Sequence, residues 1–241
     1  MNKKDLDNFQ KELRLRILEM SYRSKTSHIG SCLSSVDIIY VIYQIKKPND
    51  KIILSNGHAA VALYAVLEKM GKLKNPSLAK LHTHPDRNTK NGIDVSTWSL
   101  GQGLPIAVGM ALADKKRRVF CLVSDGECSE GSIWEALRVA YEQKLSNLTI
   151  IVNANGWGAY DPLEPGFLIR RLRGFLGGIK IINGHDLKAI KKSLIEKTKN
   201  TQLCIFAKTK SNQFPFLRGQ DDHYYVMDKK DYETAKEKLN G

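Results

Sequence analysis

Two oxygen-bearing side chains in this sequence each follow an apolar segment. Asp125 lies just beyond the segment 119–123, and Asn155, thirty positions later, lies just beyond the segment 148–152. That separation is about the length of one β-α-β unit, so we expect both side chains at the carboxyl edge of a parallel sheet, where ligands bind. Carboxylate, amide and backbone carbonyl oxygens suit Mg²⁺ that shares its coordination shell with phosphate. The pair therefore predicts a magnesium–diphosphate site.

Apolar segments alternate with helical patterns along most of the chain. Continuous apolar runs predict strands buried on both faces of a sheet, and spacings of three and four residues predict helices. This alternation predicts an α/β fold, a doubly wound parallel sheet with helices on both faces. The expected strands are 51–55, 119–123, 148–152, 179–182 and 203–207. The expected helices are 4–24, one capped by Ser34-Ser35, 57–70, one from Gly101-Gln102-Gly103, 130–144 with Ile133, Ala136, Leu137, Ala140 and Tyr141 facing inward, and 186–197.

Length and composition indicate a single domain over residues 1–241, because no linker or change in composition divides the chain. The N-terminal residues lack the apolar region of a secretory signal, and no apolar run is long enough for a membrane span. The four cysteines have no paired metal spacing. These features predict a reduced, cytoplasmic protein without a membrane partner.

The formal net charge of +13 raises the question of nucleic-acid binding. Lys and Arg are scattered, and no RNA-binding signature with interleaved aromatic residues is present. We therefore expect no nucleic-acid partner and interpret the charge mainly as a solvated surface. Attraction of phosphorylated substrates and of an acidic partner are the alternatives.

Several motifs, in order along roughly residues 10–210, resemble those of the transketolase family. They are Ser27-His28-Ile29-Gly30, Leu54-Ser55-Asn56-Gly57-His58-Ala59, His84-Pro85, Ser99-Leu100-Gly101-Gln102-Gly103, and Asp125-Gly126 with Glu130-Gly131, Trp134-Glu135-Ala136 and Asn155. The resemblance implies the thiamine diphosphate-binding fold, with thiamine diphosphate and Mg²⁺ as cofactors.

The resemblance also implies roles for individual residues. Asp125, Asn155 and the backbone carbonyl of Trp157 would hold Mg²⁺. The cofactor-binding residues would be His58, Ser99, Leu100, Gly101, Asp125, Gly126, Glu127, Asn155 and His223. Catalytic roles would fall to His28, His58 and His84 around the cofactor and donor substrate, and to Glu130, which would join a proton path between two cofactors at a subunit interface.

Three positions depart from the family pattern. Ser124 replaces a glycine before Asp125, Ile29 replaces a proline, and Trp98 stands where the family usually has glycine. Ser can adopt ordinary strand-end dihedrals, so the first departure is compatible with the site. Ile29 and Trp98 would lie near the substrate channel, and they put the ordinary sugar-phosphate substrate in question.

The resemblance does not extend to the pyrimidine-binding domain, which in this family supplies the glutamate that activates the cofactor. We therefore expect the N-terminal subunit of a split transketolase, which is active only with a C-terminal, pyrimidine-domain partner chain in a hetero-oligomer of two plus two. It would move a two-carbon ketol unit between sugars or sugar phosphates. One alternative is a related thiamine enzyme that makes a branched or modified sugar or acts on a 2-oxo acid. Another is a non-catalytic scaffold or regulatory chain.

Overall fold

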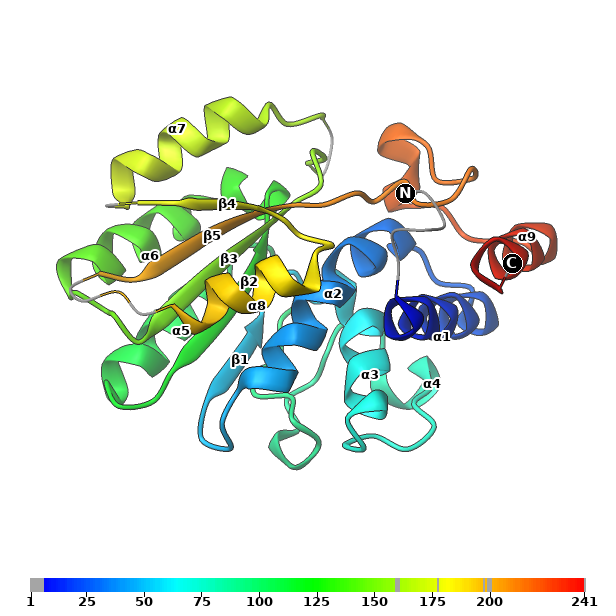
Figure 1. The fold of residues 1–241 in the computed structure, drawn as a ribbon, viewed down its shortest axis with the longest axis horizontal. Helices are drawn as coiled ribbons and strands as arrows, with labels where there is room; N and C mark the ends of the chain where they lie inside the picture. Colours follow the sequence, from blue (N-terminus) through cyan, green and yellow to red (C-terminus); the bar gives the residue numbers. More distant parts are fainter. Residues whose placement is uncertain (1–6, 159–160, 177, 197, 199–200, 241) are drawn as a thin grey trace.

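A five-stranded sheet lies at the centre of the molecule (Figure 1). The computed structural model describes residues 7–158, 161–176, 178–196, 198 and 201–240. All neighbouring strands are parallel, in the order β1-β2-β3-β5-β4. The strands are β1 (Lys51–Leu54), β2 (Val119–Ser124), β3 (Leu148–Ala154), β4 (Lys180–Asn183) and β5 (Leu203–Lys208). The predicted order of strands along the chain is confirmed, with ends that shift by one or two residues.

Two apolar cores lie on opposite faces of this sheet. Successive residues of a strand point to opposite faces, so Phe120 joins one core and Cys121 the other. The first core includes residues of α1 (Asn8–Ser24), α2 (Ile29–Ile45), α3 (Ala60–Lys69) and α8 (Leu187–Ile195). The second includes residues of α5 (Gly103–Ala113), α6 (Gly131–Glu142) and α7 (Pro165–Phe175). The predicted doubly wound α/β fold is therefore confirmed.

Short elements complete the described chain. The helix α4 (Leu78–Leu81) precedes a loop-rich stretch, and α9 (Lys229–Asn240) packs against α1. Single 3-10 turns are η2 (Gly57–Ala59), η3 (Thr89–Asn91), η4 (Gly126–Ser129) and η5 (Gly219–His223). In the described part of the chain, no helix is long and apolar enough to cross a membrane.

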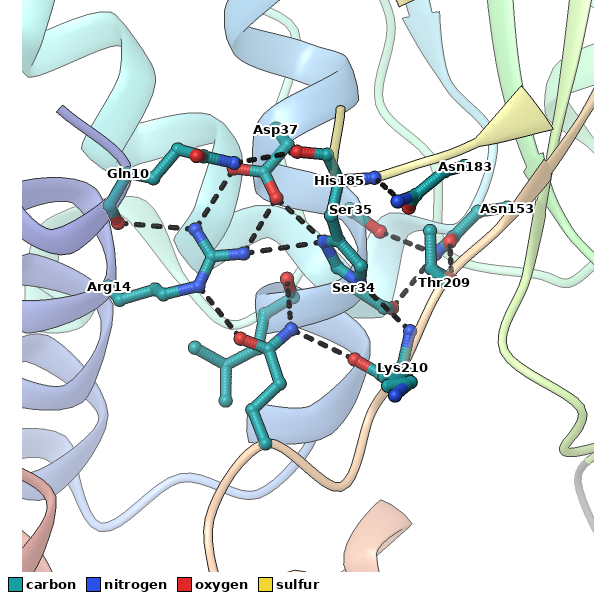
Figure 2. Close-up of polar contacts among 12 residues, drawn as sticks. Gln10, Arg14, Ser34, Ser35, Asp37, Asn153, Asn183, His185, Thr209 and Lys210 are labelled. Atoms are coloured by element: carbon teal, nitrogen blue, oxygen red, sulfur yellow. Dashed lines mark hydrogen bonds and ion pairs between the residues drawn. The ribbon is translucent and has the colours of Figure 1, made fainter. Parts of the chain in front are cut away.

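The start of α2 differs from the prediction. Ser34-Ser35 was expected to cap this helix, but the helix begins at Ile29, after His28 in a left-handed conformation with φ 63°. Both serines lie inside the helix and point toward Asn153 of β3 (Figure 2). Serine is disfavoured in the interior of a helix when its hydroxyl competes for the hydrogen bonds of the backbone. Here the Ser34 hydroxyl donates to the Ser31 carbonyl within the helix, and the Asn153 amide engages both serines, so the helix continues through them.

Two further predictions about helices were wrong or incomplete. Tyr141 was expected to face the core, but it is 51% exposed near the end of α6. None of the helices α4, α7 and α9 was predicted. A local signal for α7 is present, because the Glu164 side chain accepts hydrogen bonds from the first turn and Pro165 occupies the first helical position.

Candidate active site

The structure brings Asp125 and Asn155 together at the carboxyl ends of two adjacent strands. Ser124 of β2 is in register with Asn153 of β3, and the Asp125 amide donates to the Asn153 carbonyl at 3.1 Å. The Asp125 carboxylate accepts a hydrogen bond from the Gly156 amide at 2.7 Å, which ties the two chain turns to each other. The sequence-based placement of this pair follows from the parallel topology.

The donor set around Asp125 suits a hard cation. Asp125 is 2% exposed, and burial raises its pKa to about 7, although backbone amides, chiefly those of Gly156 and Gly126, act in the opposite direction. A divalent cation would stabilise the ionised form of such a carboxyl group. The Trp157 carbonyl oxygen would lie 3.5 Å from a methyl group placed on Gly126, so a third oxygen lies beside this turn.

These residues fit Mg²⁺ better than a transition metal. Among the described residues, no group of three or more His, Cys, Asp or Glu side chains is arranged to hold a metal ion. The set around Asp125 instead offers one carboxylate, the Asn155 amide oxygen and a carbonyl. Such a set is typical of an ion that completes its shell with water and phosphate. Metal binding by these residues stays a prediction.

Glu127 links three turns at this edge of the sheet. It is fully buried, and burial raises its pKa. One carboxylate oxygen accepts hydrogen bonds from the Ser55 hydroxyl at 2.6 Å and the Gly101 amide at 2.9 Å. The other accepts one from the Ser124 amide at 2.8 Å. Its direct contact with a cofactor stays a prediction, but these bonds show that it holds the site's turns together.

The same bonds account for the serine that replaces a family glycine. The Ser124 hydroxyl accepts a hydrogen bond from the Glu127 amide at 3.2 Å and lies 3.3 Å from the Glu127 carboxylate. Ser124 therefore takes part in the turn that presents Asp125. Neither this contact nor the role of Ser55 was predicted, although Ser55 belongs to the Leu54–Ala59 motif.

Glycine is required at Gly101 by a close approach and by the backbone conformation. Its φ is 75°, and a methyl group there would lie 2.5 Å from the Ser132 hydroxyl and 2.7 Å from Glu130 Cβ. The Gly101 turn thus sits against the start of α6, with Glu130 beside it. Ser99 and Leu100, the other predicted cofactor-binding residues of this motif, are exposed at the same turn.

Four histidines from separate segments form a cluster. The His28 ring centroid lies 5.3 Å from that of His58, 4.6 Å from that of His223 and 6.5 Å from that of His84. The His28 amide also donates to the His223 carbonyl. All four predicted histidines are therefore brought together, including His223, whose local sequence departs from the family pattern. Tyr224, which was not predicted, packs edge-on against His223 at 5.1 Å.

Trp98 lies at the exposed side of this cluster. Its indole is stacked on His84, with ring centroids 5.2 Å apart and planes 15° from parallel. It is 57% exposed. An exposed aromatic surface therefore lies against His84 of the cluster, and the position of Trp98 in a substrate channel stays a prediction.

The environment of the cluster favours neutral imidazoles. Burial, followed by the neighbouring His223 and His84, lowers the pKa of His28 to about 4. Burial also lowers the pKa of His58 well below its usual value and lowers those of His84 and His223. A neutral imidazole offers one donor and one acceptor. The buried Nδ1 of His28 has no protein partner among the described residues, so it could bind a ligand.

These shifts predict that acid destabilises the protein through this cluster. The pKa of His28 falls from 6.5 to about 4 on folding, so between these pH values the unfolded chain binds more protons at this position. His28 therefore contributes a fall in the free energy of unfolding as the pH is lowered through this window, whereas the raised pKa of Asp125 contributes a rise over much of the same range. In urea denaturation measured from pH 7 to pH 4, the free energy of unfolding of His28→Asn should rise relative to that of the wild type as the pH falls. Asparagine suits this position because it tolerates the left-handed backbone.

His82 provides a matched control for this experiment. It also has a positive φ, 59°, but its side chain is 59% exposed. His82→Asn should keep the wild-type slope of stability against pH. Equal slopes for wild type and His28→Asn would contradict the assignment of the acid sensitivity to the cluster.

Comparison with known proteins identifies the family. Residues 7–205 match the family model described as "Transketolase, thiamine diphosphate binding domain". The chain is 34% identical to human transketolase, with 82% of this chain and 36% of that protein covered. It is 30% identical to one subunit of the apulose-4-phosphate transketolase of Actinobacillus succinogenes, with 98% of this chain and 96% of that protein covered.

Solved structures agree with this assignment. Transketolase from Campylobacter jejuni superposes with a TM-score of 0.77 at 26% identity, with 98% of this chain and 43% of that chain covered. Transketolase from Leishmania mexicana, at 21% identity, shares the fold with a TM-score of 0.80 and coverage of 99% of this chain and 41% of that chain. The chain thus spans a little over a third of the mammalian relatives, 36% of human transketolase, and nearly all of the bacterial subunit. It belongs to the transketolase family and carries that family's thiamine diphosphate-binding domain.

Proposed function

We propose that this chain is the N-terminal, diphosphate-binding subunit of a two-chain transketolase that moves a two-carbon ketol unit between sugars. The observation that carries the proposal is the placement of the Asp125–Asn155 pair and the histidine cluster at the carboxyl edge of one sheet. Similarity along 96% of the Actinobacillus protein, whose name makes it one subunit of a transketolase, supports the two-chain form. In this proposal residues 1–241 act as one thiamine diphosphate-binding domain.

The protein residues would bind, orient and exchange protons. When bound, thiamine diphosphate supplies the reactive carbon that takes up and releases the two-carbon unit. Asp125, Asn155 and the Trp157 carbonyl would hold Mg²⁺ for the diphosphate group. The neutral imidazoles of His28 and His58 could each hold a substrate hydroxyl and pass a proton to or from it.

The remaining histidines and Glu130 have narrower roles in this proposal. His84 and His223 would complete the wall that faces the donor sugar. Glu130, beside the Gly101 turn, would join the proton path between two cofactors. The buried carboxylate of Glu127 would keep the turns at the cofactor edge in register, as its hydrogen bonds to Ser55 and Gly101 suggest.

The proposed partner is a separate chain with a pyrimidine-binding domain, which would supply the activating glutamate in a hetero-oligomer of two plus two. The substrate would be a sugar or sugar phosphate, and the net charge of +13 favours a phosphorylated one. We place the complex in the cytoplasm, because all four cysteines are free and buried, as is typical of proteins from reducing compartments.

Calorimetric titration of thiamine diphosphate into the full chain tests the proposed cofactor site. Binding should require Mg²⁺ and disappear when the ion is chelated, because the diphosphate group and Asp125 repel each other without it. Binding that is unchanged by chelation, or no binding in the presence of Mg²⁺, would contradict the proposal.

The stacking of Trp98 on His84 favours a second candidate function, transfer to or from a modified sugar rather than an ordinary sugar phosphate. Trp98→Gly should change the ratio of kcat/KM for a large and a small acceptor by about tenfold or more in the reconstituted enzyme, because an indole-sized group leaves the channel mouth. Affinity for thiamine diphosphate should remain at the wild-type value.

Trp98→Phe is the matched variant, since phenylalanine keeps an aromatic face over His84. It should retain most of the wild-type acceptor ratio. If Trp98→Gly leaves that ratio unchanged, Trp98 does not shape the substrate channel.

A further inference from the structure

A buried polar network lies directly beneath the proposed site. It consists of Ser34 and Ser35 of α2, Asn56 after β1, Asn153 of β3 and Thr209 after β5, and we call it the Asn153 network (Figure 2 shows all but Asn56). Asn153 is 1% exposed, and Ser34, Ser35 and Asn56 are fully buried. None of these side chains has a role in the site described above.

The hydrogen bonds of the network use the whole Asn153 side chain. Its amide nitrogen donates to the Ser34 and Ser35 hydroxyls at 2.9 Å each. Its amide oxygen accepts a hydrogen bond from the Thr209 hydroxyl at 2.6 Å. Because each N–H and the oxygen have a partner, the amide orientation is fixed by its surroundings.

Ser35 extends the network to a third strand. Its hydroxyl also accepts a hydrogen bond from the Asn56 amide nitrogen at 3.1 Å. One serine oxygen on α2 therefore joins the end of β1 to the end of β3. Buried hydrogen bonds of this kind favour one arrangement of the elements that they connect, although the Asn56 amide oxygen itself is buried without a partner among the described residues.

Three of the four connected segments, all but the one with Thr209, carry a group of the proposed site only a short distance along the chain. Asn153 lies two residues before Asn155, and its own carbonyl accepts the hydrogen bond from the Asp125 amide. Asn56 lies two residues before His58. Ser34 and Ser35 belong to the helix that begins beside His28.

We propose that Asn153 and Ser35 are positioning residues, which set the Asp125–Asn155 pair against His28 and His58 for Mg²⁺ and the cofactor. The inference rests on the proposed function. It adds that the metal side and the imidazole side of the site depend on one shared set of hydrogen bonds. Outer groups that orient metal ligands typically change metal affinity when they are lost.

The test compares two asparagines at opposite ends of β3. Asn153→Ala removes the network at the carboxyl end. Asn147→Ala is the control, because Asn147 precedes the same strand and its amide nitrogen donates to the carbonyls of Ala111, Asp114 and Arg117 at 2.9–3.1 Å. Both variants lose the hydrogen bonds of a buried or half-buried amide, so both should lower the midpoint of thermal unfolding.

Only Asn153→Ala should weaken binding of thiamine diphosphate with Mg²⁺, by about 10- to 100-fold in calorimetry on the full chain. Asn147→Ala should keep the wild-type affinity. Equal affinity in folded Asn153→Ala and wild type, or equal weakening in both variants, would overturn the inference. Failure of the wild-type chain to bind would instead contradict the proposed function itself.

Ser35→Ala provides a second variant if Asn153→Ala does not fold. It keeps the bonds of Asn153 to Ser34 and Thr209 and removes the bonds that Ser35 accepts from Asn153 and Asn56. Its affinity for thiamine diphosphate with Mg²⁺ should fall about tenfold, and an unchanged affinity would overturn the inference. Where both variants fold, the double variant should lose less than the product of the two single losses, because the residues act in one network.

Discussion

Replacing Asp125 with alanine should abolish Mg²⁺-dependent binding of thiamine diphosphate while the chain remains folded. Asp125 is the one charged ligand in the proposed metal set, and its loss leaves neutral oxygens to hold a strongly hydrated cation. Burial disfavours the ionised form of Asp125, as its pKa of about 7 indicates, so removing the carboxyl group relieves this cost. The substitution also leaves the amides of Gly126 and Gly156 without their acceptor, which lowers stability. These effects on stability oppose each other, so the main change should be in binding.

Calorimetry and urea denaturation measure the two quantities separately. Glu135→Ala is the control, because Glu135 is an exposed carboxylate paired with Arg138 on α6. It should bind the cofactor as the wild type does. Near-wild-type affinity in a folded Asp125→Ala variant would contradict the metal assignment.

Among the substitutions described here, replacing Asp37 with alanine should cause the largest fall in the free energy of unfolding. Asp37 forms two hydrogen bonds with the Arg14 guanidinium, at 2.6 and 2.9 Å, and one with the His185 ring at 2.7 Å (Figure 2). Burial alone would raise the pKa of Asp37, but Arg14 and then His185 lower it to about 2. The side chains of Arg14 and Asp37 are fully buried. Without Asp37, an unpaired guanidinium remains in the interior, at a cost of about 3–5 kcal/mol.

The comparison with an exposed ion pair makes this prediction specific. Glu135→Ala breaks an ion pair to Arg138 on the surface of α6, and it should lower the free energy of unfolding much less, because exposed ion pairs contribute little to stability. Urea denaturation at pH 7 gives both values. If Asp37→Ala lowers the free energy of unfolding no more than Glu135→Ala does, the Asp37 carboxylate is not needed to balance the buried charge of Arg14.

The sheet could be predicted from the sequence because its strands are buried on both faces. Runs such as 119–123 and 148–152 are apolar at nearly every position, which leaves few other structures for them. The same parallel topology places Asp125 and Asn155 at one edge of the sheet. The fold and this part of the candidate site therefore follow from local patterns.

The remaining features depend on contacts between distant segments. In the sequence, nothing distinguishes Arg14 and Asp37 from charged residues on a surface. In the structure they form a buried ion pair, and Asp37 also contacts His185, which lies 148 residues further along the chain. Ser34 and Ser35 are residues of a type that commonly caps helices. They lie inside α2 instead, where both hydroxyls accept hydrogen bonds from Asn153, more than a hundred residues away. Local propensity gives no information about such partners, so the start of α2 and the Asn153 network could not be predicted.

The most direct test of the two-chain proposal is a ketol-transfer assay on the purified chain with thiamine diphosphate and Mg²⁺, in the absence and presence of a pyrimidine-domain partner chain. The proposal predicts no turnover by this chain alone and transfer of a two-carbon unit when the partner is added. The Asp125→Ala variant should remain inactive with the partner, which ties the activity to this site. Full turnover by the lone chain would contradict the proposal, because the group that activates the cofactor would then lie within these 241 residues.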